Sequence, residues 1–116
     1  MKNLFCLIAL TFVFASTNVN ANTPAFSVKT KLIAANTINL TLFNLDNNYT
    51  RIQISDLNDK EVYYSEFVKN RNGFSKNLNI ENLKNGKYLL KIRSNGEVKN
   101  QVIKIKNGLV LMSKFS

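Results

Sequence analysis

The chain has 116 residues, and 16 Lys+Arg against 7 Asp+Glu give it a formal net charge of +9. It contains no His, no Trp, one Cys and one Pro. The lack of His excludes Ser-His-Asp and Cys-His catalytic triads and most catalytic zinc sites, because these depend on an imidazole.

The start of the chain, residues 1–21, has the three-part layout of a secretory signal peptide. A short basic start precedes an apolar run over 4–15, and a polar stretch then leads to Ala21. The apolar run is shorter than the roughly 20 residues that span a bilayer. We predict cleavage after Ala21, which leaves a single domain over 22–116 that does not span a membrane. Cys6 then belongs to the signal peptide; the alternative is an uncleaved N-terminal anchor.

Apolar and polar residues alternate through most of the chain from residue 28 onward. This alternation predicts half-buried antiparallel strands, because successive side chains of a strand point to opposite faces. Asn-Gly pairs at 95–96 and 107–108 predict tight hairpins, since both central residues of a type I′ turn need positive φ. We predict seven to eight short strands at 27–34, 37–43, 50–55, 61–68, 74–80, 87–94, 98–106 and 109–114. Such regular spacing indicates an all-β sandwich or barrel.

The segment 80–88 fits a tyrosine corner. In this motif the Tyr at the start of a strand turns its hydroxyl back onto upstream backbone, which here would be Tyr88. Leu83 would fill the core at the corner, and Gly86 would adopt a backbone angle that a side chain disfavours. The corner favours an immunoglobulin-like Greek-key β-sandwich over an up-and-down barrel. The alternative is a plain strand after a glycine turn.

Two segments resemble secretion-system C-terminal sorting domains. Residues 52–63 are similar to their strand–turn–strand unit, and Asn-Leu-Lys-Asn-Gly-Lys-Tyr at 82–88 resembles their Asn-Leu-x-x-Gly-x-Tyr segment. Val-Ile-Lys at 102–104 resembles their closing strand, so the likeness covers 50–106. The whole layout also resembles small exported immunoglobulin-like β-sandwich proteins of unknown function from Bacteroidetes. The resemblance implies the sandwich fold more directly than any activity.

The chain departs from those sorting domains in three ways. We expect no cargo domain beside it; it lacks their Pro-Asn-Pro opening, and it continues over 107–116 after the strand where they end. We therefore expect a non-catalytic, exported binding or envelope-associated module of unspecified ligand, periplasmic or extracellular. The alternative is an accessory or degenerate sorting-type domain that an export machinery recognises through its last strands.

Basic residues gather on the polar face of the predicted hairpin of 87–94 and 98–106. A cationic face attracts polyanions, so anionic polysaccharide or lipopolysaccharide is a candidate ligand, beside another envelope protein. The alternative is a solvated face on which Lys discourages edge pairing. Nucleic acid fits least, because this hairpin face lacks interleaved aromatic residues. The candidate anionic-ligand face consists of Lys87, Lys91, Arg93, Lys104 and Lys106.

The last predicted strand includes four apolar residues in a row, Leu-Val-Leu-Met at 109–112. We expect it to be an inner strand that closes the sandwich, because an exposed apolar edge promotes aggregation. The alternative is an edge that pairs with another chain by strand addition.

No motif predicts catalysis, a cofactor or a metal site. Asp56 and Asp59, with Glu61 beside them, lie close enough in sequence to be considered as an acid–base pair. They lie in a predicted turn, where such side chains usually bond their own backbone. The spacing of a calcium loop is absent, as are nucleophile motifs and glycine-rich phosphate loops. We therefore predict that the protein is not an enzyme.

Overall fold

A computed structural model describes residues 26–58 and 60–116, so the predicted signal peptide lies outside the described residues. Secondary structure in these ranges consists of strands. They are β2 (Ser27–Ala34), β3 (Thr37–Phe43), β4 (Thr50–Asp56), β5 (Val62–Val68), β6 (Phe74–Asn79), β7 (Gly86–Ser94), β8 (Glu97–Lys106) and β9 (Leu109–Met112). Within the described part of the chain, no helix is long and apolar enough to cross a membrane.

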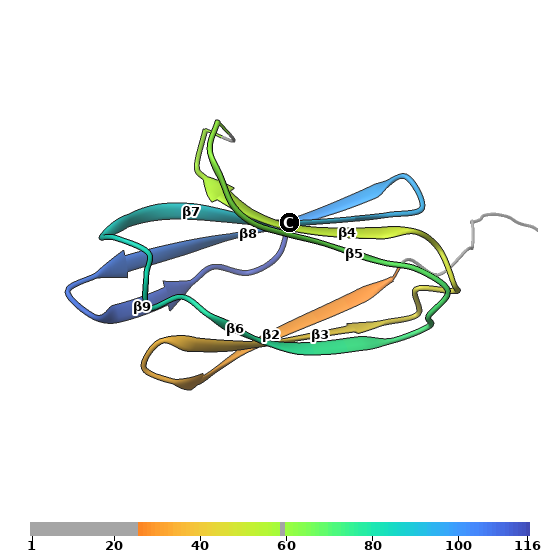
Figure 1. Cartoon of the computed structure of the whole chain (residues 1–116), viewed down its shortest axis with the longest axis horizontal. Helices are drawn as coiled ribbons and strands as arrows, with labels where there is room; N and C mark the ends of the chain where they lie inside the picture. Colours follow the sequence, from red (N-terminus) through yellow and green to blue (C-terminus); the bar gives the residue numbers. More distant parts are fainter. Residues whose placement is uncertain (1–25, 59) are drawn as a thin grey trace, which may run out of the picture.

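The strands form two packed layers (Figure 1). The smaller sheet has the strand order β2-β3-β6, and the larger has β5-β4-β7-β8-β9. All six strand pairings are antiparallel, and the chain crosses between the layers after β3, β5 and β6. The predicted all-β sandwich is therefore confirmed, whereas its immunoglobulin-like Greek-key form stays a prediction.

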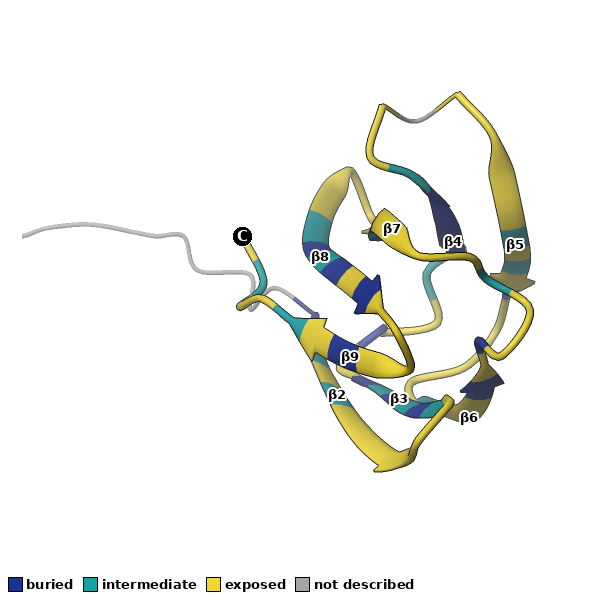
Figure 2. Cartoon of the chain, turned by 90° about the vertical axis from the view of Figure 1, so that its left-hand side faces the viewer, coloured by how far each residue is buried: buried dark blue, intermediate teal, exposed yellow. Residues whose placement is uncertain are grey.

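The core lies between the sheets and is built mainly from alternate strand residues, although β2 contributes only half-buried side chains and β4 buries four residues in a row. In β7, Leu90 and Ile92 are fully buried while Lys87 and Arg93 are exposed. Figure 2 shows the same alternation as bands of buried and exposed residues along β8. Burial of a Leu or Ile side chain contributes about 1.5–3 kcal/mol. The fully buried apolar side chains are Ile38, Leu40, Leu42, Leu45, Ile52, Leu90, Ile92 and Ile103.

Two Asn-Gly turns connect the last three strands. Asn95 and Gly96 have φ values of 50° and 79°, and Asn107 and Gly108 have values of 52° and 82°. Both central residues of each turn thus have the positive φ that a type I′ hairpin needs. The turns set which residues of β7, β8 and β9 face the core.

The last strand, β9, lies at the edge of the larger sheet rather than inside it. Val110 is buried and Met112 is half-buried, while Leu109 and Leu111 are 60% and 53% exposed. The expectation of an inner strand is therefore wrong. The strand order places β9 at the edge, since β8 is its partner among the described strands. The two-residue period of a strand then buries only alternate members of the apolar run.

A buried amide connects the tail after β9 to the first described strand. Gln101 of β8 is 5% exposed, and its Oε1 accepts a hydrogen bond of 2.9 Å from the Thr30 hydroxyl of β2. Its Nε2 donates to the backbone carbonyl of Ser113 at 2.7 Å. The tail also pairs with β8, because the Ser113 amide donates to the Val102 carbonyl. One side chain thus links both sheets and the tail.

A hydrogen bond ties the start of β7 to the loop before it. Tyr88 is buried, and its hydroxyl donates to the backbone carbonyl of Lys84 at 2.5 Å. Gly86 has a φ of 154°, a conformation that residues with a Cβ rarely adopt. Leu83 is half-buried and packs against the core. This arrangement has the geometry of a tyrosine corner.

Replacing Tyr88 with Phe removes the hydroxyl donor and keeps the ring. We expect the free energy of unfolding, measured by urea denaturation, to fall by about 0.5–1.5 kcal/mol, which is the usual net contribution of one hydrogen bond. Tyr63→Phe is the matched control, because the described residues offer its hydroxyl no hydrogen-bond partner and its ring packs edge-on against Tyr88. Equal losses in the two variants would contradict a role for the corner hydrogen bond.

Candidate functional site

The outer face of the larger sheet carries the basic residues predicted from the sequence. Lys87 of β7 lies directly opposite Lys104 of β8. Lys91 and Arg93 follow on the same face of β7, alternating with its buried residues. Lys106, at the end of β8, lies opposite Leu109, an exposed residue of β9. The structure therefore places all five residues on one side of the sheet.

The sequence analysis missed a sixth basic residue on this face, Arg51. The strand order puts β4 next to β7, and the register puts Arg51 directly opposite Arg93. The next pair on the same face is Gln53 opposite Lys91. These four side chains line a shallow hollow of about 130 Å³, which we call the arginine hollow. The alternation within β4 is visible in the sequence. The pairing of β4 with β7 joins segments that are far apart in the chain, so the sequence alone does not reveal it.

Two exposed aromatic side chains border the arginine hollow. Phe67 of β5 lies opposite Arg51, whose guanidinium carbon is 5.5 Å from the centroid of its ring. Tyr49 stacks on Phe67 with ring centroids 5.1 Å apart. Tyr49 is 56% exposed and Phe67 is 50% exposed. The outer face of the β7–β8 hairpin carries no aromatic side chain, as expected from the sequence; the two rings come from β5 and from the segment before β4, which the strand order places beside the hairpin.

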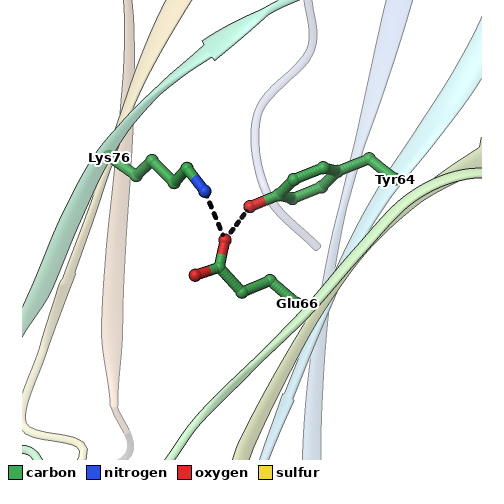
Figure 3. Close-up of polar contacts among 3 residues, drawn as sticks. All are labelled: Tyr64, Glu66 and Lys76. Atoms are coloured by element: carbon green, nitrogen blue, oxygen red, sulfur yellow. Dashed lines mark hydrogen bonds and ion pairs between the residues drawn. The ribbon is translucent and has the colours of Figure 1, made fainter.

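A polar cluster lies on the open side of the sandwich, between β5 and β6 (Figure 3). The Nζ of Lys76 is 2.8 Å from Oε1 of Glu66, and the Tyr64 hydroxyl donates to the same oxygen. Lys76 Nζ also lies 5.6 Å from the centroid of the Tyr64 ring. Since β5 and β6 are edge strands of different sheets, the cluster joins the two layers.

The contacts of this cluster shift the pKa of each member. Hydrogen bonds from Lys76 and Tyr64 hold the pKa of the Glu66 carboxyl below its usual range. The hydrogen bond to Glu66 raises the pKa of Lys76. Burial, and then the hydrogen bond to Glu66, raise the pKa of the Tyr64 hydroxyl. At neutral pH the carboxyl and the amine are thus charged and the phenol is neutral, as in a structural ion pair rather than a proton-transfer pair.

A hollow of about 290 Å³ opens beside the cluster, between β5 and β6. Apolar and aromatic side chains form most of its wall: Ile54, Leu78, Ile80, Leu83, Tyr63 and Tyr64. Lys76 and three Asn side chains complete its described lining.

Asp56, one of the candidate acid–base carboxylates, is the last residue of β4. Asp56 Oδ1 accepts hydrogen bonds from the backbone amides of Lys60 and Glu61 at 2.7 and 3.4 Å. Asp59 lies outside the described residues. Among the described side chains, no three His, Cys, Asp or Glu residues gather as a metal site. Asp56 thus caps a turn, and the non-enzyme assignment stays a prediction.

The lowered pKa of Glu66 predicts an acid-dependent contribution to stability. The contribution is complete above the ordinary Glu pKa of about 4.3 and is lost as pH falls through the lower pKa of the folded state. We expect Glu66→Gln to remove it, so that the melting temperature falls less steeply in acid than that of the native chain. Thermal melts between about pH 5 and pH 2 measure this difference.

Glu97→Gln is the control for this prediction, because Glu97 is an exposed carboxylate in the β7–β8 hairpin. Its acid profile should follow that of the native chain. Superimposable profiles of the native chain and Glu66→Gln would show that the cluster contributes nothing to acid stability.

Comparison with known proteins gives one family. The family model described as "Secretion system C-terminal sorting domain" matches residues 18–106. No curated protein and no solved structure matches the chain. The matched region includes β2 to β8 and stops before β9. It contains the stretch 50–106 that carries the resemblance in the sequence, and that resemblance is confirmed.

Proposed function

Because the chain belongs to the secretion system C-terminal sorting domain family, we propose that it is a non-catalytic sorting-type domain that an export machinery recognises. Family membership makes it an exported protein, and we place its destination beyond the periplasm. The observation that carries this proposal is the family match over 18–106, which covers most of the sandwich.

The geometry of β9 supports recognition through the last strands. β9 is the final strand of the larger sheet, so within the described part of the chain no strand pairs with its outer edge. The side chains of Leu109 and Leu111 are exposed on its outer side. A partner strand added to such an edge gains main-chain hydrogen bonds, and pockets for the alternate side chains add specificity. An exposed apolar edge also favours unwanted association, which a dedicated partner would prevent.

A reporter inserted between residues 21 and 22 of the full chain tests this function. In a cell that contains the secretion machinery, we expect the reporter to cross the outer membrane with the native domain. The double variant Leu109→Lys/Leu111→Lys should leave most of the reporter in the periplasm, because charged side chains oppose strand addition. Fractionation of medium, surface and periplasm measures the distribution.

Lys87→Gln/Arg93→Gln is the matched control, since it changes two exposed residues of β7, a strand that does not pair with β9. It should be exported like the native fusion. A native fusion that stays in the periplasm would overturn the sorting function. Normal export of the leucine variant would overturn recognition through β9.

A further inference from the structure

We propose that the outer face of the larger sheet contains a binding site for an acidic polysaccharide, centred on the arginine hollow. The ligand is a glycan that carries phosphate, sulfate or carboxylate groups. This proposal does not depend on the sorting function, because the hollow is built by β4 and β7 and recognition was assigned to the edge of β9.

The two arginines of the hollow face each other without a compensating carboxylate. Side chains directly opposite in an antiparallel pair have Cβ atoms about 4.5–5.5 Å apart, and like charges at these positions destabilise a sheet. On its other side Arg51 faces Phe67, and Arg93 faces Val98. No described cross-strand neighbour of either arginine is therefore acidic. An anionic group bound between the arginines would remove this repulsion.

Protection of sheet edges does not explain these arginines. Basic residues on edge strands discourage pairing with another chain, but β4 and β7 are inner strands of the larger sheet. If these positions only had to keep the protein soluble, Lys would serve as well as Arg. A guanidinium, however, presents a planar fork of donors that matches a carboxylate or phosphate group in two hydrogen bonds. The residue type thus favours an oxyanion.

The stacked rings of Tyr49 and Phe67 favour a glycan over other polyanions. They lie beside Arg51 at one end of the hollow, so a sugar ring could cover an exposed aromatic face while its acidic group reaches the arginines. Nucleic acid needs several aromatic residues spaced along a basic groove. The remaining apolar residues on the outer face of β7 and β8 are aliphatic: Leu89, Val98 and Val102.

A second pair of cations extends the site toward β9. Lys87 and Lys104 lie opposite each other on the same outer face, four residues from Lys91 along β7. At about 3.3 Å per residue the two groups of cations are about 13 Å apart. A polymer with repeated acidic groups can contact both at once, which raises its effective affinity above that for a single anion.

Binding of the full chain to dextran sulfate at about 150 mM salt tests the site, with neutral dextran as the control ligand. Arg51→Gln/Arg93→Gln should weaken binding by about tenfold or more, since it removes charge-assisted hydrogen bonds from the hollow. Lys29→Gln/Lys31→Gln removes the same charge from exposed positions of β2 in the smaller sheet and should weaken binding by less than about threefold. Tyr49→Ala should also weaken binding to dextran sulfate while leaving binding of inorganic sulfate unchanged.

Polygalacturonate in place of dextran sulfate distinguishes carboxylate from sulfate recognition, and either ligand supports the proposal if it depends on the arginines. Equal weakening by the two double variants would show that binding depends on diffuse positive charge rather than on the arginine hollow. That result would overturn the proposal. Tighter binding of a single-stranded oligonucleotide through the same arginines would overturn the glycan assignment. Arg93→Gln alone keeps the contact of Arg51 with Phe67 and serves if the double variant fails to fold.

Discussion

The two-residue period of the strands determines both the core and the outer surfaces of this sandwich. In β7, Leu90 and Ile92 fill the core, while Lys91 and Arg93, one residue further along, form part of the basic face. A register slip of one residue would exchange these two sets. With one Cys in the chain, an internal disulfide cannot hold the register. Apolar burial and the positive-φ turns do so instead, and thereby position the surface residues as well.

Local features of this fold could be predicted from the sequence, because they depend on neighbouring residues. The predicted strand at 37–43 has the bounds of β3, and the Asn-Gly turns give their hairpins. Features that depend on which strands lie side by side could not be predicted. Arg51 joins Arg93 only because β4 is placed next to β7, and Glu66 meets Lys76 only because the two sheets stack. The edge position of β9 likewise depends on the order of the strands in the sheet. The apolar run at 109–112 does not indicate this order.

Two separate surfaces carry the proposed recognition functions of this domain. The edge of β9 offers backbone groups and leucines, whereas the arginine hollow offers charge and aromatic rings on inner strands of the same sheet. An edge and a face lie roughly at right angles, so a partner strand on β9 leaves the hollow uncovered. Both surfaces depend on one sheet, and the Tyr64–Glu66–Lys76 cluster attaches its far edge to the other layer.

The amide of Gln101 ties the exposed C-terminal tail to the core. Its nitrogen has its acceptor on Ser113 and its oxygen has its donor on Thr30, so the tail and β2 meet at one group. Trimming the chain after Met112 would remove the acceptor of this amide, and a buried donor left without an acceptor typically costs about 1–3 kcal/mol. Such a truncation, or a bulky affinity tag that displaces Ser113, would therefore loosen β2 on the opposite layer. Faster hydrogen exchange of the β2 backbone amides would reveal this effect of a change at the C-terminus.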